Sequence, residues 1–331
     1  MKISVVIPTH NRSDALAKTL LNLSEQQFTE SWEVIVVNNR STDDTDEVVR
    51  GQRFPVPARL LHEEKPGVAA ARNAGIAVAR GQYVVLLDND ILVEPDFLSR
   101  HYDLLLSNPG CWIMGQIVNL PEQCATPFGK YRQSLYGYIP RESPGGEAYW
   151  LNGNSVSLPR SDWGRLGGFD ERFSWGEDYD FAVRAWDAGI KILFRPSIVA
   201  MHNDWAGFSI GDYCRRQRLY SQSEPFFWKK YGDRRLRMDL ARQNLPPDWR
   251  RDNPVLFAKK LVKNALAAKR WQAILSSACA FLERSWPWPP LLHRLYRLML
   301  AVATYQGFQE GLKIDNIDCS VQYGERQRPE L

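Results

Sequence analysis

The chain has 331 residues and a mass of 38.1 kDa, which at roughly 100–200 residues per domain predicts two domains, or one domain with a large appendage. Apolar residues make up 44% and charged residues 24% of the chain, so the composition excludes a disordered, fibrous or low-complexity protein. The net charge of +4 hides an asymmetry, because residues 1–204 carry 20 Lys and Arg against 26 Asp and Glu, whereas residues 205–331 carry 22 against 12. The basic second part is expected to face an anionic partner, such as a phospholipid surface, a lipid pyrophosphate or nucleic acid.

The first 90 residues alternate short apolar runs with helical patterns. Residues 3–7 and 33–37 are rich in β-branched side chains and predict buried parallel strands, the first ending at Pro8. Residues 14–25 between them have a helical apolar face, with Ser13 as the expected N-cap. The same alternation predicts helices over 45–49 and 67–79 and strands over 58–62 and 82–87. We therefore expect a doubly wound, mostly parallel α/β sheet, with ligands beyond the carboxyl ends of its strands.

The rest of the chain changes character twice. Residues 110–165 are rich in Gly, Pro and aromatics and predict substrate or acceptor loops, with a strand over 150–158. A turn at 167–170, a helix over 177–189 and a strand pair over 190–202 follow. Beyond about residue 211 the sequence becomes helical and dense in Arg, Lys and Trp. We predict an α/β domain over 1–210 and a basic, Trp-rich, mainly α-helical extension over 211–331.

Location is predicted from what the sequence lacks. The five cysteines are odd in number, far apart and without a CxxC pair, which argues against a disulfide framework or a zinc site. The first residues show no signal-peptide pattern, and no run of 18 uncharged apolar residues predicts a membrane span. We therefore expect a cytoplasmic protein.

Asp88-Asn89-Asp90 directly follows the strand predicted over 82–87. Two carboxylates two residues apart at a strand end reach into one site and favour a divalent cation, Mn²⁺ or Mg²⁺, which prefers oxygen ligands and shares them with substrate phosphates. The alternative is an Asx-rich turn that caps the following segment.

The chain at this point resembles the family 2 glycosyltransferases with the GT-A fold. Five blocks in order carry the resemblance, and they are residues 3–11, 36–45, 71–75, 86–90 and the paired Gly-Gly-Phe-Asp-Glu (167–171) and Trp-Gly-Glu-Asp-Tyr-Asp (175–180). His202 resembles the histidine that closes many GT-A cores. The resemblance ends near residue 210 and therefore leaves the tail undefined.

The resemblance implies a nucleotide-sugar site with a metal. The nucleotide-binding residues it implies are Pro8, Thr9, Asn11, Arg12, Asn38, Asn39, Arg72, Asp88 and Asn89. Asp90 would hold the metal, with Asp88 and His202 completing its shell, although a lone histidine after a strand is also typical of a hydrogen-bonded wall residue. The family usually has an aspartate where this chain has Asn38-Asn39, which leaves the choice among uridine, thymidine and guanosine nucleotides open, with UDP favoured. The alternative for this pair is a turn tolerant of left-handed backbone.

Transfer of a sugar with inversion needs a base to take the proton of the acceptor hydroxyl. The resemblance puts Asp178 in that role, and the neighbouring charge of Glu177 is expected to raise its pKa. The same two residues are also typical first-turn acids of a helix, and both interpretations hold together. Trp175, Asn152, Gly153 and Asn154 are expected to line the sugar and acceptor sites, as is Trp150, although the tryptophans also fit a core.

Basic pairs and tryptophans interleave in the tail, a composition that suits an anionic membrane surface. Residues 291–300 predict an amphipathic helix that lies on that surface or packs back on the catalytic domain, whereas no nucleic-acid module is recognisable. We expect an inverting, metal-dependent glycosyltransferase acting on a hydroxyl of a glycan or lipid-linked acceptor in cell-envelope polysaccharide biosynthesis, peripheral at the inner face of the cytoplasmic membrane. The alternative is a degenerate, non-catalytic GT-A scaffold or binding subunit.

Overall fold

The computed structural model describes residues 1–136, 146–148, 150–204, 208–232 and 238–315. The chain divides into two compact units, Met1–Trp205 and Ala206–Leu331, and each is described by itself. The sequence placed the corresponding boundary at residue 210.

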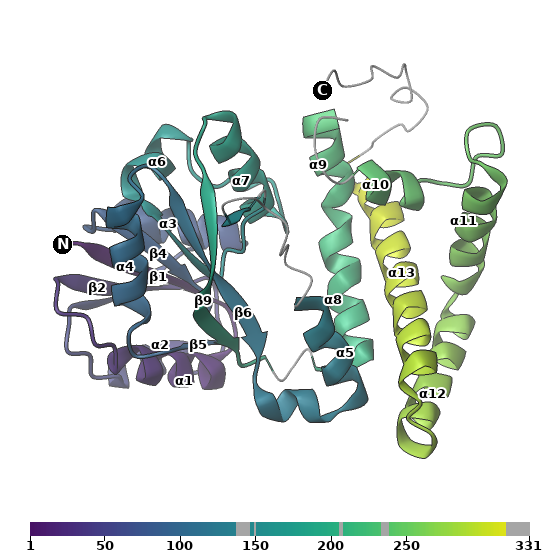
Figure 1. The fold of residues 1–331 in the computed structure, drawn as a ribbon, viewed down its shortest axis with the longest axis horizontal. Helices are drawn as coiled ribbons and strands as arrows, with labels where there is room; N and C mark the ends of the chain where they lie inside the picture. The colour runs from purple at the N-terminus through teal and green to yellow at the C-terminus, as the bar shows by residue number, and fades with distance from the viewer. Residues whose placement is uncertain (137–145, 149, 205–207, 233–237, 316–331) are drawn as a thin grey trace. The chain divides into compact units, whose positions relative to one another are not determined.

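A nine-stranded sheet forms the centre of the first unit (Figure 1), in the order β3-β2-β1-β4-β8-β6-β9-β5, with β7 paired to β9. Four parallel strands make up one half: β1 (Ile3–Thr9), β2 (Trp32–Asn38), β3 (Ala58–His62) and β4 (Tyr83–Leu87). The other half holds β5 (Ile91–Val93), β6 (Trp112–Asn119), β7 (Glu147–Ala148), β8 (Ser155–Pro159) and β9 (Ile192–His202). β5, β7 and β8 run antiparallel to their neighbours, so the sheet is mixed but mostly parallel, as predicted.

Helices pack on both faces of this sheet, which explains the unbroken apolar runs of its central strands. The helices are α1 (Ser13–Ser24), α2 (Thr45–Gly51), α3 (Val68–Val78), α4 (Phe97–Ser107), η1 (Pro121–Ala125), α5 (Pro127–Tyr136), α6 (Arg160–Arg165) and α7 (Glu177–Asp187). Alternate residues of β1 join different core clusters: Val5 packs with Leu16 of α1, whereas Val6 packs with Ile76 of α3 and Phe181 of α7. Burial on both faces is the usual condition of a parallel strand between helix layers.

Four local expectations were wrong. β1 runs through Pro8 to Thr9, because β4 pairs only with residues 3–6 and Pro8 has a single neighbouring strand, where its missing N–H is tolerated. Ser13 is the first residue of α1 and not its cap. The region over 110–165 holds β6 and α5 in addition to loops.

The fourth difference concerns residues 190–202, which form the single strand β9 and not a strand pair. Its pairing with β6 shifts register between Gly115 and Gln116, which pair with Arg195 and Val199, so residues 196–198 bulge out of the ladder. Pro196 and Ser197 are exposed at this bulge.

Helices make up the described part of the second unit: α8 (Ile210–Gln222), α9 (Glu224–Tyr231), α10 (Met238–Asn244), α11 (Pro254–Leu266), α12 (Lys269–Ser285) and α13 (Pro289–Ile314). α13 contacts each of the others and buries Tyr296 and Phe308. Gly307 and Gly311 let it approach α8, because a Cβ at either position would lie within about 2 Å of a backbone oxygen, 2.0 Å from Arg218 O and 2.1 Å from Gln222 O.

The helix predicted over 291–300 is thus the start of α13, which packs among the other helices of its own unit. Across the described residues, no helix combines the length and hydropathy needed to cross a bilayer.

Candidate functional site

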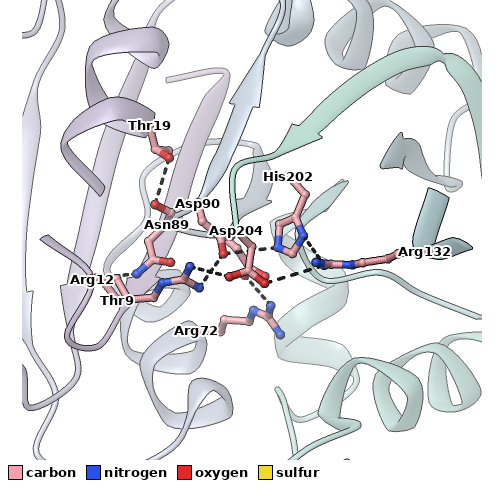
Figure 2. Close-up of polar contacts among 10 residues, drawn as sticks. Thr9, Arg12, Thr19, Arg72, Asn89, Asp90, Arg132, His202 and Asp204 are labelled. Carbon is pink, nitrogen blue, oxygen red and sulfur yellow. Dashed lines mark hydrogen bonds and ion pairs between the residues drawn. The ribbon is translucent and has the colours of Figure 1, made fainter. Parts of the chain in front are cut away.

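The carboxyl ends of β1, β2 and β4 lie at one edge of the sheet, because the three strands are parallel and adjacent. This geometry brings Thr9, Asn38 and Asp88 together from distant parts of the sequence. Asn89 fixes the arrangement, since its amide donates to Thr9 Oγ1 at 2.8 Å and its carbonyl accepts from Thr19 Oγ1 of α1 at 3.0 Å (Figure 2).

Two carboxylates and an imidazole converge beside this edge. Ligand atoms of Asp90, His202 and Asp204 all lie within 4.8 Å of one another, and all three residues are buried. β5 and β9 bring them together, because Ile91 pairs with His202 in register and the amide of Asn203 donates to Asp90 O at 2.7 Å. The sequence predicted Asp90 and His202 here, whereas it missed Asp204.

Two arginines hold this group (Figure 2). Arg12 donates through Nη1 to Asp90 at 2.6 Å and through Nη2 to Asp204 at 2.9 Å, so one guanidinium bridges both carboxylates. Arg132 of α5 is buried and lies 3.1 Å from His202 Nδ1 and 3.7 Å from Asp204. Burial opposes the charge of Asp90, but His202 and Arg12 outweigh it and lower the pKa of this carboxyl.

The donor set fits a divalent metal. Carboxylate oxygens and an imidazole nitrogen suit Mn²⁺ or Mg²⁺ with nucleotide phosphates as further ligands. Buried carboxylates need a compensating positive charge, and Arg12 supplies it to both Asp90 and Asp204.

Arg72 of α3 connects this edge with the start of α7. Its guanidinium is buried and donates to Asp88 Oδ1 at 2.9 Å, to Gly153 O at 3.1 Å and to Glu177. Gly153 leaves room for this guanidinium, because a Cβ there would lie 2.6 Å from Arg72 Nη2 and one of the two groups would have to move. Partial burial raises the pKa of Asp88, Arg72 opposes this, and Asp90 adds to it, with a net upward direction.

The start of α7 presents the two acids differently. Glu177 is buried against Arg72, and its pKa is raised by burial and by the neighbouring Asp178. Asp178 is only half-buried. Its carboxylate accepts from Gly153 N at 3.2 Å and from Tyr179 N at 2.8 Å, which orients it toward the 152–154 loop.

The amides of Asn38 and Asn39 form hydrogen bonds with nearby backbone groups and with the Asp46 carboxylate. Asn39 donates to the carbonyls of Glu63 at 2.8 Å and Lys65 at 2.7 Å and accepts from Gly67 N at 2.9 Å. Asn38 donates to Asp46 at 2.7 Å and accepts from Ser41 N at 2.8 Å.

Neither asparagine has the left-handed backbone of the turn alternative, which occurs at Arg40 instead. A direct contact of Asn38 or Asn39 with a nucleotide base stays a prediction. Asn11, which has a φ of 50°, accepts from Thr42 N at 2.6 Å and ties together the loops after β1 and β2.

The expected acceptor loop, residues 152–154, contains a buried polar atom that the described residues leave unpaired. Within the described residues, Asn154 Oδ1 is buried and has no hydrogen-bond partner. Asn152 donates its backbone N–H to Met114 Sδ at 3.3 Å, Trp175 is half-buried just before α7, and Trp150 packs against the core.

Two residues of the site, Asp204 and Arg132, were not predicted from the sequence. Asp204 stands two residues after His202, a spacing at a strand end that repeats that of Asp88 and Asp90 and was available as a signal. No such signal indicated Arg132, because its segment was interpreted as loops and not as the helix α5.

Comparisons with known proteins agree with this geometry. The sequence model described as glycosyl transferase family 2 matches residues 4–138, and that of glycosyl transferase family group 2 matches residues 83–307. The validoxylamine A glucosyltransferase of Streptomyces hygroscopicus subsp. jinggangensis is 30% identical over 234 residues, 57% of this chain and 52% of that protein. The amylovoran biosynthesis glycosyltransferase AmsB of Erwinia amylovora is 31% identical over 208 residues, 58% of this chain and 66% of AmsB.

Solved structures show the same fold at low identity. The mannosyltransferase PcManGT from Pyrobaculum calidifontis, in complex with GDP-Man and Mn²⁺, superposes with a TM-score of 0.63 at 20% identity over 93% of this chain and 88% of that one. S. aureus TarS 1-349 in complex with UDP-GlcNAc gives 0.50 at 17% identity over 96% and 92%. The chain spans about half the length of the validoxylamine A glucosyltransferases it matches. With the family matches and the GT-A fold in agreement, the chain belongs to the family 2 glycosyltransferases.

Proposed function

We propose that this chain is an inverting, metal-dependent glycosyltransferase that moves a sugar from a nucleoside-diphosphate sugar to a hydroxyl of a glycan or lipid-linked acceptor. The observation that carries the proposal is the placement of the Asp90–His202–Asp204 group and of Asp178 at one edge of the sheet, where Arg72 joins their sequence neighbours Asp88 and Glu177. Two of the similar solved structures support it, because one is a complex with GDP-Man and Mn²⁺ and the other is a complex with UDP-GlcNAc.

Asp90, His202 and Asp204 would hold Mn²⁺ or Mg²⁺, with Asp88 beside them. A bound cation there stabilises the negative charge that develops on the departing diphosphate. Arg12 holds the two carboxylates together and remains beside them as a cationic partner for phosphate oxygens. Thr9 and Asn89 shape the wall on which the nucleotide rests.

Asp178 would act as the base. The acceptor oxygen attacks the anomeric carbon, its proton passes to Asp178, and the bond from the anomeric carbon to the diphosphate oxygen breaks on the opposite face. The backbone N–H of Gly153 holds the carboxylate in place. Glu177 and Arg72 act as positioning residues, since both are buried and contact each other.

The donor class is the first question for experiment. Calorimetric titration of UDP, GDP and dTDP, each with and without Mn²⁺, is expected to show metal-dependent binding of one nucleotide. Asp90→Ala is expected to abolish that binding, whereas Asp204→Asn is expected to weaken it about 10- to 100-fold. Asp103→Asn, an exposed acid on α4, is the matched control and should bind as the wild type does.

Absence of binding by any of the three nucleotides would favour the alternative of a non-catalytic scaffold. Inversion is tested separately, by assigning the anomeric configuration of the first product by NMR. Retention of the donor's configuration would contradict the role given to Asp178.

A further inference from the structure

Two neighbouring helices of the second unit, α11 and α12, turn apolar side chains outward. On α11 these are Val255, Ala258, Val262 and Ala265, whose spacing of three, seven and ten residues places them on one face of the helix. All four are exposed, Val255 by 64%.

The inward side of the same helix carries two lysines. Lys260 is only 1% exposed and its ammonium contacts both oxygens of Asp252, at 2.7 and 2.9 Å. Lys263 donates to Gln243 O at 3.2 Å and to Asn244 Oδ1 at 2.9 Å. Leu256, Phe257 and Leu266 of α11 are half-buried, so the outward apolar residues are additional to an inward face that is itself only partly apolar.

α12 repeats the outward apolar pattern and adds positive charge. Trp271, Ile274, Ala278 and Phe281 have the same spacing and are all exposed, Phe281 by 65%. The positions of Arg270 and Arg284 are fourteen residues apart and fall on a line along one flank of this apolar stripe. Over residues 254–285 six Lys and Arg face a single acid, Glu283, which accepts from the hydroxyl of Tyr296.

Two tryptophans lie in the turn between α12 and α13, where the apolar stripe of α12 ends. Trp286 and Trp288 are 62% and 50% exposed and stack at an interplanar angle of 15°. Tryptophans with adjacent cations are the side chains that settle at the boundary between lipid headgroups and acyl chains.

We propose that this surface, made of the outward faces of α11 and α12 and of Trp286 and Trp288, binds an anionic phospholipid bilayer. The apolar stripes enter the headgroup region while Arg270, Arg284 and Lys259 meet lipid phosphates. A second copy of the chain is disfavoured, because an isologous interface would oppose the same arginine row to itself. The inference does not depend on the proposed transferase activity.

Vesicle flotation of the full chain tests it. Vesicles of equal parts phosphatidylcholine and phosphatidylglycerol are expected to carry the protein, vesicles of phosphatidylcholine alone are not, and added salt is expected to weaken the binding. Wild type that floats with neither composition would overturn the proposal.

The variants separate the two contributions. Ile274→Ser with Phe281→Ser, and independently Arg270→Gln with Arg284→Gln, are each expected to weaken binding about tenfold or more. Leu21→Ser with Leu106→Ser removes two equally exposed apolar side chains from the first unit and is the matched control, as is Lys18→Gln with Arg80→Gln for charge. If either control lowers binding as much as its counterpart, the surface is wrongly assigned.

Folding of each variant is checked by its thermal transition and by nucleotide binding. Trp286→Ser with Trp288→Ser, outside the helices, provides a second test of the apolar contribution with the same expected loss. Sedimentation equilibrium without lipid is expected to give a species that does not change with these substitutions. A dimer abolished by the Ile274 and Phe281 changes would instead identify a second copy as the occupant.

Discussion

The two units differ in which charged and apolar side chains they bury and which they expose. In the first, the strands bury their apolar residues on both faces, and buried charges gather where strands end, each with a partner of opposite sign. In the second, α11 buries Lys260 and exposes Val255, and α12 exposes Phe281.

Apolar side chains are usually buried and charged ones exposed, and the comparison shows that the residues that depart from this pattern are the ones that indicate function. A buried charge or an exposed apolar stripe costs folding free energy, so its persistence needs a reason outside folding. In the first unit the proposed reason is a ligand with phosphates, and in the second it is the proposed phospholipid surface. The predictions below test each half of this contrast.

The largest expected effect is that of Asp178→Asn. Removal of a general base is expected to lower kcat about 10²- to 10⁴-fold, because the amide does not accept the acceptor's proton. The measurement is steady-state transfer from the donor identified by calorimetry. Nucleotide affinity and vesicle binding are expected to stay at wild-type values, and transfer at the wild-type rate would sink the assignment.

Arg72→Met is expected to be the most destabilising change in the first unit. It leaves Glu177 buried without its cation, and breaking a buried pair costs about 3–5 kcal/mol of unfolding free energy. Urea denaturation measures the loss. Arg50→Met is the matched control, since Arg50 pairs with Asp46 on the surface and its loss is expected to cost about 0.5 kcal/mol or less. Equal losses in the two variants would show that the Arg72 contacts do not stabilise the fold.

Gly307→Ala tests the packing of the second unit. Its Cβ would lie 2.0 Å from Arg218 O, so α13 and α8 have to separate, at a cost of about 1–3 kcal/mol. Gly211→Ala on α8 meets only Ser209 Oγ, at 3.8 Å. It is expected to leave stability unchanged or raise it by up to about 1 kcal/mol. The opposite signs, measured by denaturant unfolding, distinguish close helix contact from helix propensity, and a stabilising Gly307→Ala would contradict the packing.

The sequence predicted what depends on local pattern. Residues 3–7 and 33–37 are read as strands because burial on both faces leaves continuous β-branched runs. The pairing of Asp90 with His202 was expected from the family resemblance. Arg132 was not predictable, because it reaches His202 only through the placement of α5. The residues that flank Arg132 in the sequence give no sign of that contact.

The limits in the tail have the same origin. An amphipathic pattern states that one helix face is apolar but not what covers it. Residues 291–300 were left between two partners, and the structure packs Tyr296 beside a third, α12, where its hydroxyl donates to Glu283. The stripes of α11 and α12 have a similar pattern and the opposite placement. Only the structure separates a covered face from an open one.

The smallest effect concerns Glu310 of α13, which accepts from Arg218 and Gln222 of α8. The Arg218 hydrogen bond lowers the pKa of Glu310, with burial opposing it. A lowered carboxyl pKa adds stability above the ordinary value of 4.5, and that contribution is lost as pH falls through the lowered value. Since both side chains are partly exposed, Glu310→Gln is expected to cost only about 0.5 kcal/mol at neutral pH and nothing in acid. Unfolding free energies of the wild type and the variant should therefore converge as the pH falls below that range, and a difference that persists there would assign the effect to packing and not to charge.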